Sequence, residues 1–428
     1  MNVEESTRLK TFRQLRKEIR GSKEYLIVGI DVAKNKHHAF FGTATGKTLF
    51  RRLVVENDLS GFERLHMHME ALKVEHHLSK VVFGLEPTAN YHKPLAEYLI
   101  KCSHTVVLVS GVAVTRNREL MNGRWDKNDD KDSANVADLI SQGKCLYYDY
   151  PSLPLRELRD LLSLKRRLKK QEHGTKTRIR NHLLAQYFPE FDRYFGKGGS
   201  EGLSIVKWCL KPSIIAGMEY DEFVQLVAPR VKTIGQGNRL KAIWDVAVES
   251  IGCSAGESLG FEAKLMVGDL QQIKASTRAV DEHIKDICLG FPEYSYLLTI
   301  PGFGPDVSSK VLGAIGNPFR FDNGKQVLKL AGYDLGANRS GNTSDRAVPV
   351  ISKRGNAYLR YALYQAAFIA SRSNRYFIIY YTNKLRGRER ENGIKTKMKV
   401  KLAAKVLIIA WTLMKKKEPF DPKFLNID

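Results

Sequence analysis

The first 150 residues alternate short apolar runs with amphipathic segments, and this alternation limits the folds open to the chain. Buried strands are indicated by three runs rich in β-branched residues, EYLIVGIDVA, KVVFGLEP and HTVVLVS. Two further strand-like runs flank a glycine-bounded turn in HHAFFGTATGKTLFRRLVVEN. Helices are expected in LSGFERLHMHMEAL, KPLAEYLIKC and KDSANVADLISQ. The resulting order, βββαβαβα with mixed strand pairing, is that of an α/β ribonuclease-H-like domain.

From residue 151 the pattern becomes helical. Leu158, Leu161, Leu164 and Leu168 recur at three- and four-residue spacing, which predicts a long amphipathic helix with a basic outer face. This helix could form a coiled coil between two chains, or a hairpin with a second helical stretch at residues 262–289. Residues 188–260 are expected to be helical and contain no motif that points to a function.

The chain is therefore expected to contain a ribonuclease-H-like domain, a helical or coiled-coil middle and a mostly α C-terminal domain. Near the start of the last part, Gly302 and Gly304 form a turn before a helix. Such a turn could bind a phosphate or could simply connect two helices. The predicted boundaries are an N-terminal extension at 1–22, then domains or segments at 23–150, 151–290, 291–385 and a basic C-terminal helix and tail at 386–428.

The net charge of +23 and the pI near 9.7 indicate an anionic partner. Nucleic acid is favoured over a membrane, because the longest apolar run, residues 402–414, is too short to span a bilayer and contains Lys405. The N-terminal residues have no apolar core typical of a secretory signal. The five cysteines form no CxxC motif, so reduced thiols in the cytoplasm are expected.

Four acids of the first domain are candidate metal ligands. Asp31 and Glu86 end predicted strands, and Asp129 and Asp132 lie three residues apart at a predicted helix start. Each alone could be a helix cap or a capped strand end. Together they form a set of hard oxygen ligands that suits Mg²⁺ or Mn²⁺, and two such ions could polarise a phosphodiester.

Several segments resemble the insertion-sequence-110 type transposases, a family of bridge-RNA-guided recombinases. In the first domain these are VGIDVAKNKHHAF, GLEPTANYHKPLAEYL and DKNDDKDSANVADLI. In the C-terminal part they are LLTIPGFGPDVSSKVLGAIG, LKLAGYDLGANRSG and VISKRGNAYLRYAL. The chain departs from the family pattern at Ala89, Asn128 and Ser133, where Gly, Thr and Ala are usual, but no departure removes an acid.

The resemblance implies a RuvC-like domain whose DEDD site, Asp31, Glu86, Asp129 and Asp132, is both catalytic and metal-binding. It also implies a serine nucleophile, Ser340, with Ser344 and Ser352 as alternatives. Cations around this serine would hold the scissile phosphate: Arg339, Arg346, Lys353, Arg354 and Arg360. The expected partners are donor and target DNA, a guide RNA and further copies of the chain, as a dimer or tetramer, near the bacterial or archaeal nucleoid. The basic helix offers a compatible surface for RNA through Lys165, Arg166, Arg167, Lys169 and Lys170.

Two other functions remain open from the sequence. A structure-specific DNA nuclease, similar to a Holliday-junction resolvase, would use the four acids and two metal ions, with Ser340 as an ordinary loop residue. A nucleic-acid-binding protein without catalysis would use the acids as caps and the lysines as phosphate contacts. A covalent link between protein and DNA would distinguish the recombinase from both.

Overall fold

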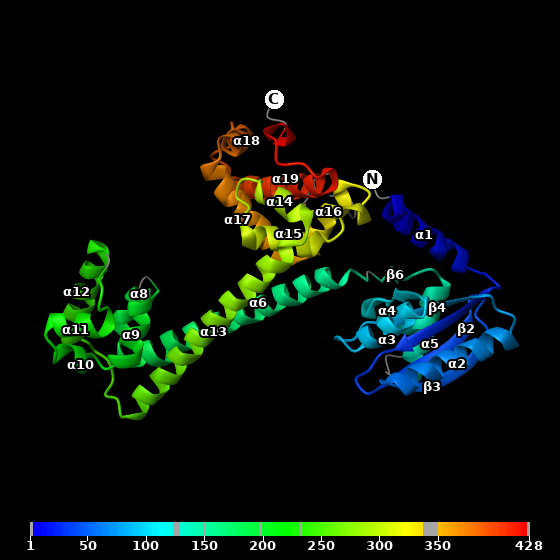
Figure 1. Cartoon of the computed structure of the whole chain (residues 1–428), viewed down its shortest axis with the longest axis horizontal. Helices are drawn as coiled ribbons and strands as arrows, with labels where there is room; N and C mark the ends of the chain where they lie inside the picture. The colour runs from blue at the N-terminus through cyan, green and yellow to red at the C-terminus, as the bar shows by residue number, and fades with distance from the viewer. Residues whose placement is uncertain are drawn as a thin grey trace. The chain divides into compact units, whose positions relative to one another are not determined.

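The computed structural model describes residues 3–122, 129–148, 150–196, 199–231, 233–336 and 350–425 (Figure 1). The chain divides into two compact units, residues 1–151 with 319–322 and residues 152–318 with 323–428. The described part of the first unit mixes strands and helices, and that of the second is mostly helical. This agrees with the mixed α/β domain and the mostly α C-terminal part expected from the sequence.

The first unit contains a six-stranded sheet with the order β3-β2-β1-β4-β5-β6. The strands β1, β2 and β3 form an antiparallel meander, whereas β4 runs parallel to β1 and β5 parallel to β4. A short β6, which the sequence pattern did not reveal, pairs antiparallel with β5. The strand bounds are β1 (Tyr25–Asp31), β2 (Lys36–Thr43), β3 (Thr48–Glu56), β4 (Lys80–Glu86), β5 (Thr105–Leu108) and β6 (Leu146–Tyr147).

Helices cover both faces of this sheet. On one face α2 (Leu59–Glu75) and α3 (His92–Lys101) pack over a core that includes Val28, Ile30 and Phe83. On the other face Ile27 and Val82 pack with α1 (Val3–Ile19), α4 (Gly111–Asn122) and α5 (Asp129–Ser141). Successive strand residues point to opposite faces, so the nearly continuous apolar character of β1 and β4 follows from their burial on both sides.

Two glycines allow α5 to approach the sheet closely. Gly29 and Gly84 are neighbours in register on β1 and β4. A Cβ atom on Gly29 would lie 2.2 Å from the carbonyl oxygen of Ser133, and one on Gly84 would lie 1.9 Å from Cδ1 of Ile140. Any side chain at these positions would therefore push α5 away from the strands.

The second unit is organised around two long helices, α6 (Leu153–Arg178) and α13 (Ser258–Leu289), which pack against each other. They run in opposite directions and form a hairpin within one chain (Figure 1). Leu158 is buried, and Leu161, Leu164 and Leu168 are half-buried. The leucine spacing had left two possibilities, a coiled coil between chains and a hairpin within one chain. The structure shows the hairpin.

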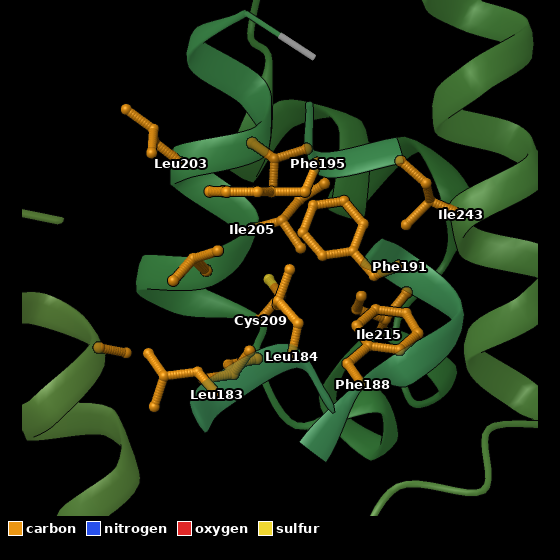
Figure 2. Close-up of a cluster of buried hydrophobic side chains, with 14 of the residues drawn as sticks. Leu183, Leu184, Phe188, Phe191, Phe195, Leu203, Ile205, Cys209, Ile215 and Ile243 are labelled. Atoms are coloured by element: carbon orange, nitrogen blue, oxygen red, sulfur yellow. The ribbon is translucent and has the colours of Figure 1, made fainter. Parts of the chain in front are cut away.

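The residues between the two long helices, 179–257, form a helical lobe, here called the tip lobe. Phe188, Phe191 and Phe195 lie at its centre, with Ile205 and Ile215 packed around them (Figure 2). The lobe begins with a π-helical turn, Ile179–Leu184, that continues α6. Its remaining helices are α7 (Ala185–Tyr187), a 3₁₀ turn (Pro189–Phe191), α8 (Asp192–Phe195), α9 (Ser200–Trp208), α10 (Pro212–Ala216), α11 (Tyr220–Val227) and α12 (Ile234–Val248).

At the other end of the hairpin lies the C-terminal helical part (Figure 1). A two-residue antiparallel pair, β7 (Leu335–Gly336) with β8 (Val350–Ile351), interrupts its helices. Among the described residues no helix is long and apolar enough to cross a membrane. The helices are α14 (Pro292–Leu298), α15 (Pro305–Ile315), α16 (Gly324–Ala331), α17 (Ala357–Ser373), α18 (Arg375–Leu385) and α19 (Ile394–Lys416), with 3₁₀ turns at Pro318–Arg320 and Pro422–Leu425.

Candidate active site

Two of the predicted acids end adjacent strands of the first unit. Asp31 is the last residue of β1, Glu86 is the last residue of β4, and the two are partners in register. Each lies two residues beyond a glycine that faces α5, so both acids belong to the sheet face that α5 covers. The sheet thus brings together two carboxylates that are far apart in the sequence.

The third predicted acid, Asp132, lies on α5 and is only 2% exposed. Ser133 follows it and has its carbonyl against Gly29, so the first turns of α5 lie close to β1. Asp129 is the first residue of the same helix, and its side chain lies outside the described residues. Asp132 therefore belongs to the same corner of the fold as Asp31 and Glu86.

Three neighbours of these acids were not singled out from the sequence. Nη2 of Arg118, on α4, donates a hydrogen bond to Oδ1 of Asp132. His38, on β2, is the register partner of Asp31. A Cβ atom on Gly111 would lie 2.7 Å from Oε1 of Glu86, so this carboxylate lies against the first residue of α4, where a helix favours negative charge.

The donor set suits a divalent ion in its chemistry. Carboxylate oxygens are the ligands that Mg²⁺ and Mn²⁺ prefer, and two of the predicted carboxylates end adjacent strands while a third lies on α5. Within the described parts of the chain, no three His, Cys, Asp or Glu side chains are close enough to hold an ion. Asp132 is instead engaged by Arg118. The residues that would hold a metal are Asp31, Glu86 and Asp132. Asp129 would be a fourth ligand, and its side chain lies outside the described residues.

The predicted nucleophile, Ser340, lies in the sequence between β7 and β8. Ser340, Ser344, Arg339 and Arg346 are outside the described residues. The two strands are paired, Leu335 with Ile351 and Gly336 with Val350. This pair of strands is here called the β7–β8 support.

The residues that follow β8 form a tightly built turn. Ser352 donates its hydroxyl to Oδ1 of Asp334 at 2.5 Å and its backbone N–H to the carbonyl of Asp334 at 2.8 Å. Lys353 adopts a positive φ of 55°, a strained conformation for a residue other than glycine. Nη1 of Arg360 donates to the carbonyl of Ala331 at 2.8 Å. Ser352 and Arg360 are thus bonded within the support, whereas the side chains of Lys353 and Arg354 are exposed.

The five predicted cations of α6 differ in their surroundings. Lys165, expected on the exposed basic face, is instead buried. It is 8% exposed, and its ammonium lies 2.6 Å from Asp281 and 2.5 Å from Asp306. Its carboxylate partners come from α13 and α15, which the spacing within α6 could not reveal. Lys169 is exposed but pairs with Glu172 at 2.8 Å. Arg166 lies over the ring of Tyr358, and Arg167 and Lys170 are exposed.

The glycine turn before α15 serves packing. Gly302 has a φ of +86°, and a Cβ atom there would lie 2.4 Å from the carbonyl oxygen of Ala366 on α17. The first turn of α15 holds the chain's own anion, Asp306, which pairs with Lys165 and Lys310. These contacts favour a connection between helices over a phosphate site, the two possibilities that the sequence left open.

Comparison with known proteins points to one family for both parts of the chain. Residues 28–189 match a model of DEDD transposases of the IS110 type, and residues 294–382 match a model of the IS116/IS110/IS902 transposase family. A 43.6 kDa protein of insertion element IS110 from Streptomyces coelicolor is 24% identical over 355 residues, which are 80% of this chain and 83% of that protein. A predicted transposase of Sinorhizobium fredii, y4rJ, is 34% identical over 122 residues, or 28% of this chain and 30% of that protein. Since these matches cover both parts of the chain, the chain belongs to the IS110 family of insertion-element transposases.

Proposed function

We propose that this transposase cuts and rejoins DNA through the hydroxyl of Ser340, assisted by a divalent-metal site of Asp31, Glu86, Asp129 and Asp132. The observation that carries the proposal is that β1 and β4 end side by side in two acids on the sheet face covered by α5, which bears Asp132. A bound Mg²⁺ or Mn²⁺ would stabilise the negative charge that develops on the phosphate.

In this proposal residues 23–150 form a RuvC-like domain with a ribonuclease-H-like fold, and residues 291–385 form the serine transposase domain. The antiparallel meander of β1, β2 and β3, extended by the parallel strands β4 and β5, supports the first assignment. Membership of the IS110 family supports the second.

The covalent chemistry conserves the energy of the cut bond. The oxygen of Ser340 attacks the phosphorus, and its proton passes to a carboxylate of the acidic site, from this protomer or a neighbouring one. The bond from phosphorus to the deoxyribose oxygen breaks, and that oxygen takes up the proton from the carboxylate, which leaves a phosphoserine link and a free DNA hydroxyl. A hydroxyl of the strand to be joined then attacks the same phosphorus, and its proton passes through the carboxylate to the serine oxygen, which is released as the serine hydroxyl. Cutting and rejoining in this order need no ATP.

The exposed cations that follow β8 are suited to hold the scissile phosphate. Lys353 and Arg354 follow the β7–β8 support directly, and we place Arg339 and Arg346 with them. Arg360 has a different role in this scheme. It holds the carbonyl of Ala331 and so fixes the turn from which Lys353 and Arg354 project.

A guide RNA and the DNA would lie along α6 and the C-terminal helices, where the positive charge is concentrated. α6 contains nine basic and three acidic residues. Arg166, Arg167, Lys169 and Lys170 are retained in this proposed surface, and Lys165 is left out because it is buried between two acids. Since recombination joins two duplexes, we propose a dimer or tetramer as the working assembly.

An adduct assay tests this function. The protein is incubated with Mg²⁺, donor and target DNA and RNA transcribed from the flanks of the insertion element, then denatured and analysed for end-labelled DNA that migrates with protein. We expect an adduct that Ser340→Ala and Asp31→Asn abolish and that Ser352→Ala retains.

Other outcomes would identify the competing functions. Cleavage without an adduct, insensitive to Ser340→Ala and abolished by Asp31→Asn, would make the protein a two-metal nuclease. DNA binding with no cleavage under any of these conditions would leave a nucleic-acid-binding protein.

A further inference from the structure

Arg118 places a positive charge beside Asp132, one of the proposed metal ligands. Its guanidinium contacts Oδ1 of Asp132, and the two side chains are 13% and 2% exposed. A carboxylate so deeply buried is stable as an anion only beside a positive charge. In this structure the positive charge is that of Arg118.

The contact leaves Arg118 incompletely bonded. Its Nε atom is buried and has no hydrogen-bond partner among the described residues. A buried guanidinium nitrogen without a partner is costly, so the attraction to Asp132 is opposed by this loss of hydration. The arrangement therefore favours replacement of this guanidinium at Asp132 by a cation of higher charge.

The helix that carries Arg118 does not depend on this contact for its position. The adjacent Asn117 donates hydrogen bonds to Oδ1 of Asn135 at 3.2 Å and to Oδ2 of Asp138 at 2.9 Å, both on α5. Val114 of α4 and Val136 of α5 also belong to the same buried core. α4 can therefore remain on α5 while the side chain of Arg118 leaves Asp132.

We infer that Arg118 is a positioning residue that neutralises Asp132 when no metal is bound and competes with the divalent ion for that carboxylate. This inference rests on the proposed function, because it requires that Asp132 be a metal ligand. The competition lowers the affinity of the site for metal. The neutralisation of Asp132 keeps the fold around the acids stable before the metal enters.

The structure offers a closely matched control elsewhere in the chain. In the tip lobe Nη2 of Arg239 donates to Oε1 of Glu201 at 2.6 Å, and these side chains are 24% and 6% exposed. Nε of Arg239 is likewise buried without a partner in the described parts. Arg239→Gln thus breaks a similar buried ion pair that has no part in the acidic site.

The test measures binding of Mn²⁺ to the full-length protein, without DNA, by the paramagnetic resonance signal of the free ion. Removing one positive charge near the ion is expected to tighten Mn²⁺ binding by about five- to tenfold in Arg118→Gln. Arg118→Lys, which keeps the charge, should bind as the unaltered protein does, and so should Arg239→Gln. Thermal unfolding should show a larger Mn²⁺-induced rise in Tm for Arg118→Gln than for Arg239→Gln.

Failure of the inference and failure of the metal site give different results. Equal or weaker Mn²⁺ binding by Arg118→Gln, with clear binding by the unaltered protein, would overturn the role of Arg118 alone. Should Arg118→Gln not fold, tighter Mn²⁺ binding by Arg118→Lys than by the unaltered protein would contradict the competition. Absence of saturable Mn²⁺ binding to the unaltered protein would overturn the proposed metal site and the inference with it.

Discussion

Charged residues buried along α6 show how single side chains depend on their ion-pair partners. Lys165 reaches Asp281 on α13 and Asp306 on α15. Glu172 is 8% exposed and accepts from Lys169 and Lys176, each at 2.8 Å. The helical period identified the buried stripe of leucines, but it could not tell which charged residues of that helix face solvent.

Glu172 makes a contribution to the free energy of unfolding that depends on pH. Burial alone would raise its pKa, but hydrogen bonds from Lys169 and Lys176 outweigh this and hold the pKa at about 2. A lowered carboxyl pKa contributes stability that is present above the unfolded value of 4.5 and is lost as the pH falls toward 2. Glu172→Gln should therefore lower the free energy of unfolding by about 2–3 kcal/mol at neutral pH.

Denaturant titrations across pH would check this expectation. The difference between Glu172→Gln and the unaltered protein should shrink as the pH is lowered below 4.5, over the range where the fold persists. Glu157→Gln, an exposed site on the same helix, should show little difference at any pH. A constant deficit in Glu172→Gln at all pH values would mean that packing, not charge, explains its effect.

At the scale of elements, the position of α5 on the sheet determines where Asp132 lies relative to β1 and β4. The helix approaches β1 and β4 over two glycines, and its backbone lies where a side chain on Gly29 would be. Asp132 lies at the same end of α5 as Ser133, whose carbonyl contacts this glycine. A displacement of α5 would thus move a proposed metal ligand together with the core.

Gly29→Ala should destabilise the first unit, because the added Cβ would be 2.2 Å from a backbone oxygen that cannot rotate away. We expect a loss of about 3 kcal/mol in the free energy of unfolding, at the upper end of the usual cost of overpacking. Gly268→Ala, on the exposed face of α13 with no atom within 4 Å, should instead gain about 0.5–1 kcal/mol from helix propensity. Equal effects of the two changes in denaturant titrations would contradict the close approach of α5.

Sequence periodicity predicted β1 to β5, the helices α2, α3 and α5, and the strand ends at Asp31 and Glu86, but neither α1 nor β6. It did not predict α4, and so it missed Arg118, because the partner of a buried acid is fixed by the packing of α4 on α5. His38 was missed for a related reason: only the register of β1 with β2 brings it beside Asp31. Contacts between elements require a register and a packing angle, which local patterns do not contain.

At the scale of the whole molecule, the positive charge is unevenly distributed along the chain. The tip lobe, residues 179–257, has nine basic and nine acidic residues and is therefore neutral. α6 alone has nine basic residues against three acidic ones. The excess of +23 thus lies outside the lobe. Nucleic-acid binding should depend on α6 and not on the tip lobe.

Salt dependence of DNA binding can test this division, because each phosphate that a cation neutralises releases condensed counterions. Replacing Arg167 and Lys170 on α6 with Gln should reduce the slope of log K against log salt by about 1.8, since each neutralised phosphate accounts for about 0.9 of it. Replacing Arg230 and Lys241 in the tip lobe with Gln removes the same charge from the chain and should leave the slope unchanged. Fluorescence anisotropy of labelled DNA over a salt series gives both slopes. If the slope fell equally in the two double variants, net charge alone would govern binding, and α6 would have no special place in the proposed interface.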